Sequence, residues 1–100
     1  LTIERFEAGN IDPATFDHEA HIYVAWQYIR TYARNDAISR FDAALRRLTE
    51  KIGATEKYNA MITWLFMLLI AERARAGEDW SAFRTRNSDL FDDFPRSAAA

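Results

Sequence analysis

The chain has 100 residues, of which 49% are hydrophobic and 28% charged, and its formal net charge is −2. This length fits a single domain with its own core, and the balance of charges excludes a basic surface for nucleic acid. The absence of cysteine excludes a disulfide framework and favours a reducing, cytoplasmic setting. The strongest apolar stretch, residues 60–71, is too short for a membrane span of ~20 residues, so no membrane association is expected.

Apolar residues recur at helical spacing along the whole sequence. This periodicity predicts an all-α fold, a compact bundle of four to five helices in a single domain over residues 1–94, followed by a frayed tail over 95–100. A short amphipathic helix is expected over residues 2–8. Asp12 and Pro13 are expected to start the next helical segment, as N-cap and first helical residue.

A longer helix is expected over about residues 17–33, and its inner face includes both histidines of the chain, His18 and His21. With this spacing of three, the two imidazoles lie on one face of the helix. Imidazole is a frequent metal ligand and the usual proton carrier near neutral pH. The histidine pair is therefore the first candidate for a functional site.

A third helix is expected from a cap at Asn35-Asp36 to about residue 52. A fourth helix, capped by Thr55, is apolar on nearly every side from residue 61 to 71. Such a helix is typically surrounded by other elements, so it is predicted to be the buried central helix. Short helical segments are expected after Asp79 and Ser88.

Short connections would make each successive pair of long helices antiparallel, so the second and fourth helices would run parallel with both starts at one end. The start of the fourth helix would then lie beside the histidine pair. The sequence therefore predicts a polar, ligand-binding pocket built from His18, His21, Tyr58, Asn59 and Thr63.

Three interpretations of this pocket stay open. The leading one is a bundle that binds a small molecule or a divalent transition metal, with His18 and His21 as metal ligands, although a metal site needs at least three protein ligands and the chain has no third histidine. The alternative is a non-catalytic interaction module with structural histidines, which acts through a homodimer or a partner surface. The third is a hydrolase-like or lyase-like enzyme in which His18 or His21 is the base.

Two segments carry a family resemblance, namely Phe16-x-His18-x-x-His21 and Lys57-Tyr58-Asn59-x-x-Ile62-Thr63. The chain resembles a family of small, uncharacterised bacterial helical proteins that share a Phe-x-His-x-x-His start and a Lys-Tyr-His-x-x-x-Thr stretch. The resemblance implies an all-helical fold and no established activity. Asn59 stands where similar sequences have a histidine, so a three-histidine metal site of the relatives would be incomplete here.

Overall fold

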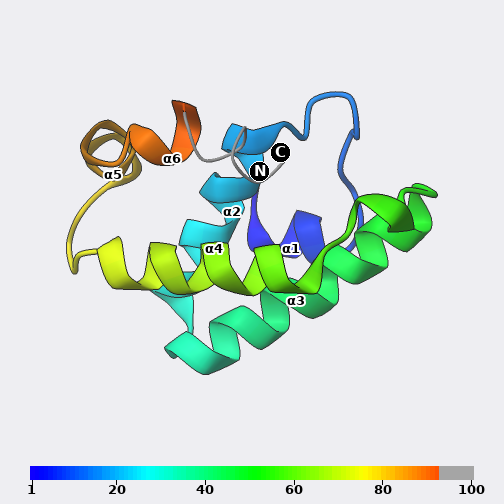
Figure 1. Ribbon diagram of the computed structural model, residues 1–100, viewed down its shortest axis with the longest axis horizontal. Helices are drawn as coiled ribbons and strands as arrows, with labels where there is room; N and C mark the ends of the chain where they lie inside the picture. The colour runs from blue at the N-terminus through cyan, green and yellow to red at the C-terminus, as the bar shows by residue number, and fades with distance from the viewer. Residues whose placement is uncertain (93–100) are drawn as a thin grey trace.

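The computed structural model describes residues 1–92, and all of their regular secondary structure is helical (Figure 1). The predicted all-α fold class is therefore confirmed, and the described part of the chain includes four helices of seven residues or more. The predicted tail over 95–100 lies outside the described residues. In chain order the elements are α1 (Ile3–Glu7), α2 (His18–Thr31), α3 (Arg34–Lys51), the 3-10 turn η1 (Thr55–Lys57), α4 (Ala60–Arg73), α5 (Trp80–Arg86) and α6 (Asp89–Asp92).

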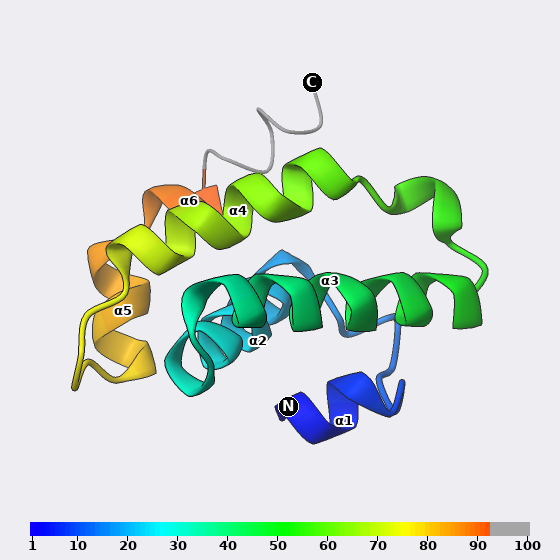
Figure 2. The same ribbon diagram turned by 90° about the horizontal axis from the view of Figure 1, so that it is seen from below.

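The helices α2, α3 and α4 pack against one another, and α1 and α4 lie on opposite sides of α3 (Figure 2). Helices α3 and α4 run in opposite directions, whereas α2 crosses α4 steeply (Figure 1). The predicted parallel packing of the second and fourth helices is therefore wrong. The connection between α2 and α3 consists of Tyr32 and Ala33, both with extended backbone, which redirects the chain within two residues.

In the first half of the chain, two helices begin at other residues than the sequence predicts. Asp12 and Pro13 form an isolated turn, in which the Asp12 carboxylate accepts a hydrogen bond from the Ala14 N–H at 3.0 Å, so no helix begins there. Helix α2 is instead capped by Asp17, whose carboxylate accepts from the Ala20 N–H. Helix α3 begins after Ala33, which provides no side-chain cap. The predicted cap residues 35–36 instead lie inside the first turn of α3.

The start of the fourth helix is also displaced, and this change affects the site. Thr55 begins the 3-10 turn η1 and does not cap α4. The cap is Asn59, whose side-chain oxygen accepts a hydrogen bond from the Ile62 N–H at 3.0 Å. An asparagine side chain that caps a helix in this way satisfies one of the first four N–H groups, which have no partner inside the helix.

The core on the α1 side is aromatic. Phe6 of α1 is fully buried and stacks on Phe41 of α3, with ring centroids 5.4 Å apart. Tyr28 of α2 meets both rings edge-on, and its hydroxyl donates a hydrogen bond of 2.8 Å to Glu7. Burial and the Glu7 carboxylate raise the pKa of Tyr28 far above its usual range, so the hydroxyl remains a donor. These contacts attach the short helix α1, which is too short to be stable alone.

Helix α4 is not the central helix that the sequence predicts, because it lies at the outside of the molecule (Figure 2). Its inner face includes the buried residues Thr63, Met67 and Ile70. Its outer face remains exposed even though it is apolar, with Met61 81% and Leu65 53% accessible. No helix among residues 1–92 has both the length and the apolar character to cross a membrane.

We predict that Phe6→Ala lowers the free energy of unfolding by about 3–5 kcal/mol, since it removes a fully buried ring and leaves a cavity between three helices. Arg5→Ala, in the same helix but exposed, is the control and is expected to change stability by less than ~0.5 kcal/mol. Urea denaturation measures both. Equal effects of the two substitutions would contradict the role of Phe6.

Candidate functional site

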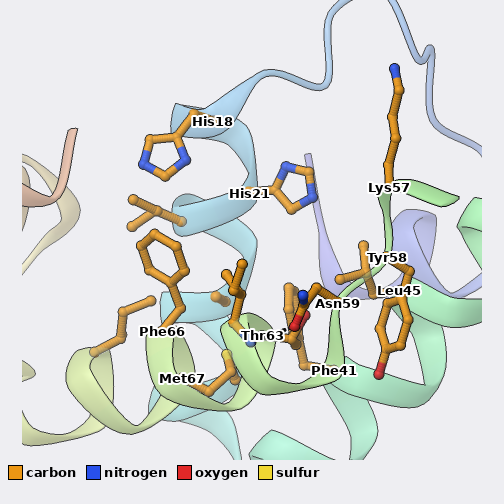
Figure 3. A pocket seen from close by; sticks show the side chains of 14 residues that line it. His18, His21, Phe41, Leu45, Lys57, Tyr58, Asn59, Thr63, Phe66 and Met67 are labelled. Atoms are coloured by element: carbon orange, nitrogen blue, oxygen red, sulfur yellow. Dashed lines mark hydrogen bonds between the residues drawn. The ribbon is translucent and has the colours of Figure 1, made fainter. Parts of the chain in front are cut away.

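A cavity of about 260 Å³ lies between α2, α3 and the start of α4 (Figure 3). The five residues of the predicted pocket, His18, His21, Tyr58, Asn59 and Thr63, all line it. Most of its wall is apolar and comes from Ile22, Ala25, Phe41, Leu45, Ile62, Phe66, Met67 and Ile70. The cavity is therefore an apolar hollow with polar groups gathered at the first turns of α2 and α4.

His18 connects the start of α2 to the end of the described chain. Its Nε2 lies 2.8 Å from the carbonyl oxygen of Leu90, so Nε2 carries the hydrogen and donates. The ring also packs against Phe66 of α4 and Phe91 of α6, with centroids 5.5 Å and 6.4 Å away. These contacts give His18 a structural role, with one nitrogen, Nδ1, left as an acceptor.

His21 packs on Phe16, with ring centroids 4.2 Å apart, and its Nδ1 lies 3.3 Å from the carbonyl oxygen of Asp17. Burial lowers the pKa of His21 below the ordinary value of 6.5, an effect that the nearby His18 strengthens. His21 is therefore neutral at pH 7. A hydrogen on Nδ1 donated to Asp17 leaves Nε2 as a hydrogen-bond acceptor.

Tyr58 contributes its ring but not its hydroxyl. The hydroxyl donates a short hydrogen bond to Asp42 of α3 and accepts one of 2.9 Å from Arg46, and Figure 3 shows it turned away from the histidines. Burial and the Asp42 carboxylate raise the pKa of Tyr58. Tyr58 therefore attaches η1 to α3, and this bonding closes one end of the cavity.

Thr63 and Asn59 supply the polar groups that have no hydrogen-bond partner within residues 1–92. Thr63 is only 8% exposed. Its hydroxyl makes no hydrogen bond in this part of the chain, and the hydroxyl oxygen is accessible to solvent. Asn59 uses its oxygen on the helix cap and keeps its NH₂ group available. The hydroxyl of Thr63, a mostly buried residue, is therefore accessible, and it is available to hydrogen-bond a ligand in the cavity.

Lys57 also lies at the edge of the cavity, a residue that the predicted pocket did not include. The sequence signal for it is the segment Lys57-Tyr58-Asn59, which also carries the family resemblance. Figure 3 shows its side chain extending away from Asn59 and Thr63, with the ammonium at the far end. The cavity itself therefore holds neutral polar groups.

The described residues include no group of three histidine, cysteine or acidic side chains that could hold a metal ion. A metal site at His18 and His21 stays a prediction, and His18 would have to give up its bond to Leu90 if Nε2 were the ligand atom. Within residues 1–92 neither histidine is hydrogen-bonded to a carboxylate, the group that commonly orients a general base. Catalysis by either histidine also stays a prediction.

No protein-family model, no curated protein and no solved structure matches this chain. The resemblance to the small bacterial family therefore stays a prediction, and the site is interpreted from its own geometry.

The lowered pKa of His21 predicts how stability depends on pH. In the unfolded chain His21 titrates near 6.5, whereas in the folded protein it takes up a proton only at lower pH. As the pH falls through 6.5, the unfolded state therefore takes up a proton before the folded state does. The free energy of unfolding falls over this range and is unaffected by His21 at higher pH.

Urea denaturation of the wild type and of His21→Gln at about pH 7.5 and about pH 5.5 tests this expectation. The wild type should lose more stability between the two pH values than the variant, which lacks the titrating group. An equal loss in both proteins would mean that the pKa of His21 is not lowered by folding.

Proposed function

We propose that the protein is a binding protein that holds a small, mainly apolar molecule with one neutral polar head group in the cavity between α2 and α4. The observation that carries this proposal is the Thr63 hydroxyl, which has no partner among the described residues and lines an apolar cavity. A ligand that hydrogen-bonds to this hydroxyl while it fills the apolar wall would gain about 0.5–1.5 kcal/mol from that bond.

The size of the cavity limits the ligand. A dry apolar cavity of about 150 Å³ accepts benzene, so the 260 Å³ here fits a molecule of roughly ten non-hydrogen atoms. Such a ligand is at the small end of what protein pockets bind. A short alkyl chain or a single aromatic ring would fill the apolar wall around Ala25 and Met67.

The polar groups favour a neutral head that both donates and accepts hydrogen bonds, such as an alcohol or a primary amide. Asn59 offers its NH₂ group, Thr63 offers a hydroxyl, and the neutral His21 offers Nε2 as an acceptor. A carboxylate would meet no cation inside the cavity, since the Lys57 ammonium extends away from it (Figure 3).

A divalent metal at His18 and His21 has less support, because His18 is already bonded to Leu90. We also propose a cytoplasmic location, because the cysteine-free sequence suits a reducing compartment.

The first test uses 1-octanol as the probe and isothermal calorimetry as the measurement. The wild type should bind it with a Kd of about 1 mM or tighter. Ala25→Leu adds methyl groups where Ala25 lines the cavity, so binding should weaken at least tenfold, or about 1.4 kcal/mol. Ala43→Leu, on the exposed side of α3, is the matched control and should bind as the wild type does. Equal binding by both variants would place the alcohol elsewhere.

The second test concerns the head group. Thr63→Val keeps the shape of the side chain and removes the hydroxyl, so the Kd for 1-octanol should rise about threefold to tenfold. The free energy of unfolding without ligand should not fall, because the hydroxyl has no partner within residues 1–92 to lose. A large loss of stability would reveal a structural role instead. Tighter binding of octanoate than of 1-octanol would contradict the neutral head group.

A further inference from the structure

A second depression, of about 510 Å³, lies where the end of α2, the start of α3 and the end of α4 come together. Three arginines line it, namely Arg30 of α2, Arg34 of α3 and Arg75, which follows α4. The rest of its lining is small or aliphatic and consists of Ile29, Ala71, Ala74, Ala76 and Gly77. We call this depression the arginine pocket. It shares no lining residue with the cavity beside the histidines, so the two are separate sites.

The three arginines of the pocket have no carboxylate partner in the described part of the chain. Five other arginines of residues 1–92 form ion pairs, namely Arg40, Arg46, Arg73, Arg84 and Arg86. Arg30, Arg34 and Arg75 are exposed, and within residues 1–92 their side chains form neither an ion pair nor a hydrogen bond. Three positive charges without a bound carboxylate therefore line one depression.

The acidic residues close to these arginines in the sequence do not neutralise the pocket. The Asp36 carboxylate is bound to Arg40 at 2.8 Å. The Glu78 carboxylate accepts two hydrogen bonds from Arg86, at 2.7 Å and 2.8 Å. Glu72 is exposed on α4 and, like the other two, does not line the pocket. The carboxylates of this region are therefore directed elsewhere.

The positions of the helix ends explain two of the three arginines but not the third. Arg30 lies in the last turn of α2 and Arg75 follows α4, where the negative end of the helix dipole favours a cation. Arg34 is the first residue of α3, at the positive end, where the dipole disfavours a cation. The three like charges also repel one another. A bound anion would offset both effects.

Arg30 is held in a position from which it can donate. Its guanidinium lies over the ring of Trp26, 4.6 Å from the ring centroid. Stacking of this kind uses the face of the guanidinium and leaves its N–H groups, which point outward in the plane, free to donate. These N–H groups form a planar fork that fits two oxygens of a phosphate or a carboxylate.

We propose that the arginine pocket binds a small, soluble oxyanion with two or more negative charges, of the phosphate or carboxylate type. Three guanidiniums match the charge and the geometry of such a molecule, and the small residues between them leave room for it. The net charge of −2 favours a small anion over a nucleic acid or an anionic membrane, which need a basic surface of larger extent. This proposal does not depend on the ligand of the other cavity.

Isothermal calorimetry with sodium pyrophosphate and with sodium citrate, in about 50 mM NaCl at about pH 7.5, tests the site. The wild type should bind at least one of the two with a Kd of about 0.1–1 mM, and the tighter of them identifies the type of oxyanion. Arg34→Gln should weaken this binding about fivefold to tenfold. Arg47→Gln is the matched control, because Arg47 is exposed on the same helix but does not line the pocket. It should bind as the wild type does.

Four results would overturn the proposal. They are the absence of binding to both anions at about 10 mM, equal weakening by the two substitutions, binding only to vesicles of anionic lipid, and a loss of stability in Arg34→Gln without anion. Equal weakening would mean that the anion is attracted only by the overall charge. A loss of stability in urea denaturation would mean that Arg34 has a structural partner, whereas the proposal predicts an unchanged or higher free energy of unfolding.

Discussion

The hydrogen bond between His18 and the Leu90 carbonyl joins residues 72 positions apart and holds the first turn of α2 against α6. Helix α2, which begins at this bond, crosses α4 instead of lying along it (Figure 1). Helices that cross steeply contact each other over a short length, and the space beside the crossing has to be closed by other groups. Here Tyr58, bonded to Asp42 and Arg46, closes one end. What remains between these two attachments is the cavity.

The composition of α4 follows from its position beside this cavity. Its inner residues line an apolar hollow, and its outer residues Met61, Leu65 and Leu68 are exposed. A helix with two apolar faces does not have to be central, because one face can line a cavity while the other lies at the surface. The polar exception is Thr63, on the inner face, where a hydroxyl without a partner within residues 1–92 faces apolar side chains.

Local patterns in the sequence predicted the fold class, because helical periodicity acts over a few positions. The five residues of the predicted pocket do line the cavity, although the parallel packing from which they were predicted is wrong. The sequence did not predict the crossing of α2 over α4, since this depends on the extended backbone of Tyr32 and Ala33. It also favoured Thr55 over Asn59 as the helix cap, two residues with similar capping ability. The surface position of α4 could not be predicted either, because an apolar circumference fits a buried helix and an interface helix equally well.

Nuclear Overhauser contacts from bound 1-octanol test most directly whether the space between α2 and α4 receives a ligand. If it does, the alkyl chain contacts the methyl groups of Ala25, Met67 and Ile70, which line the cavity. Contacts to Met61 and Leu68 alone would mean that the alcohol only covers the exposed side of α4, and would contradict a binding role for the cavity.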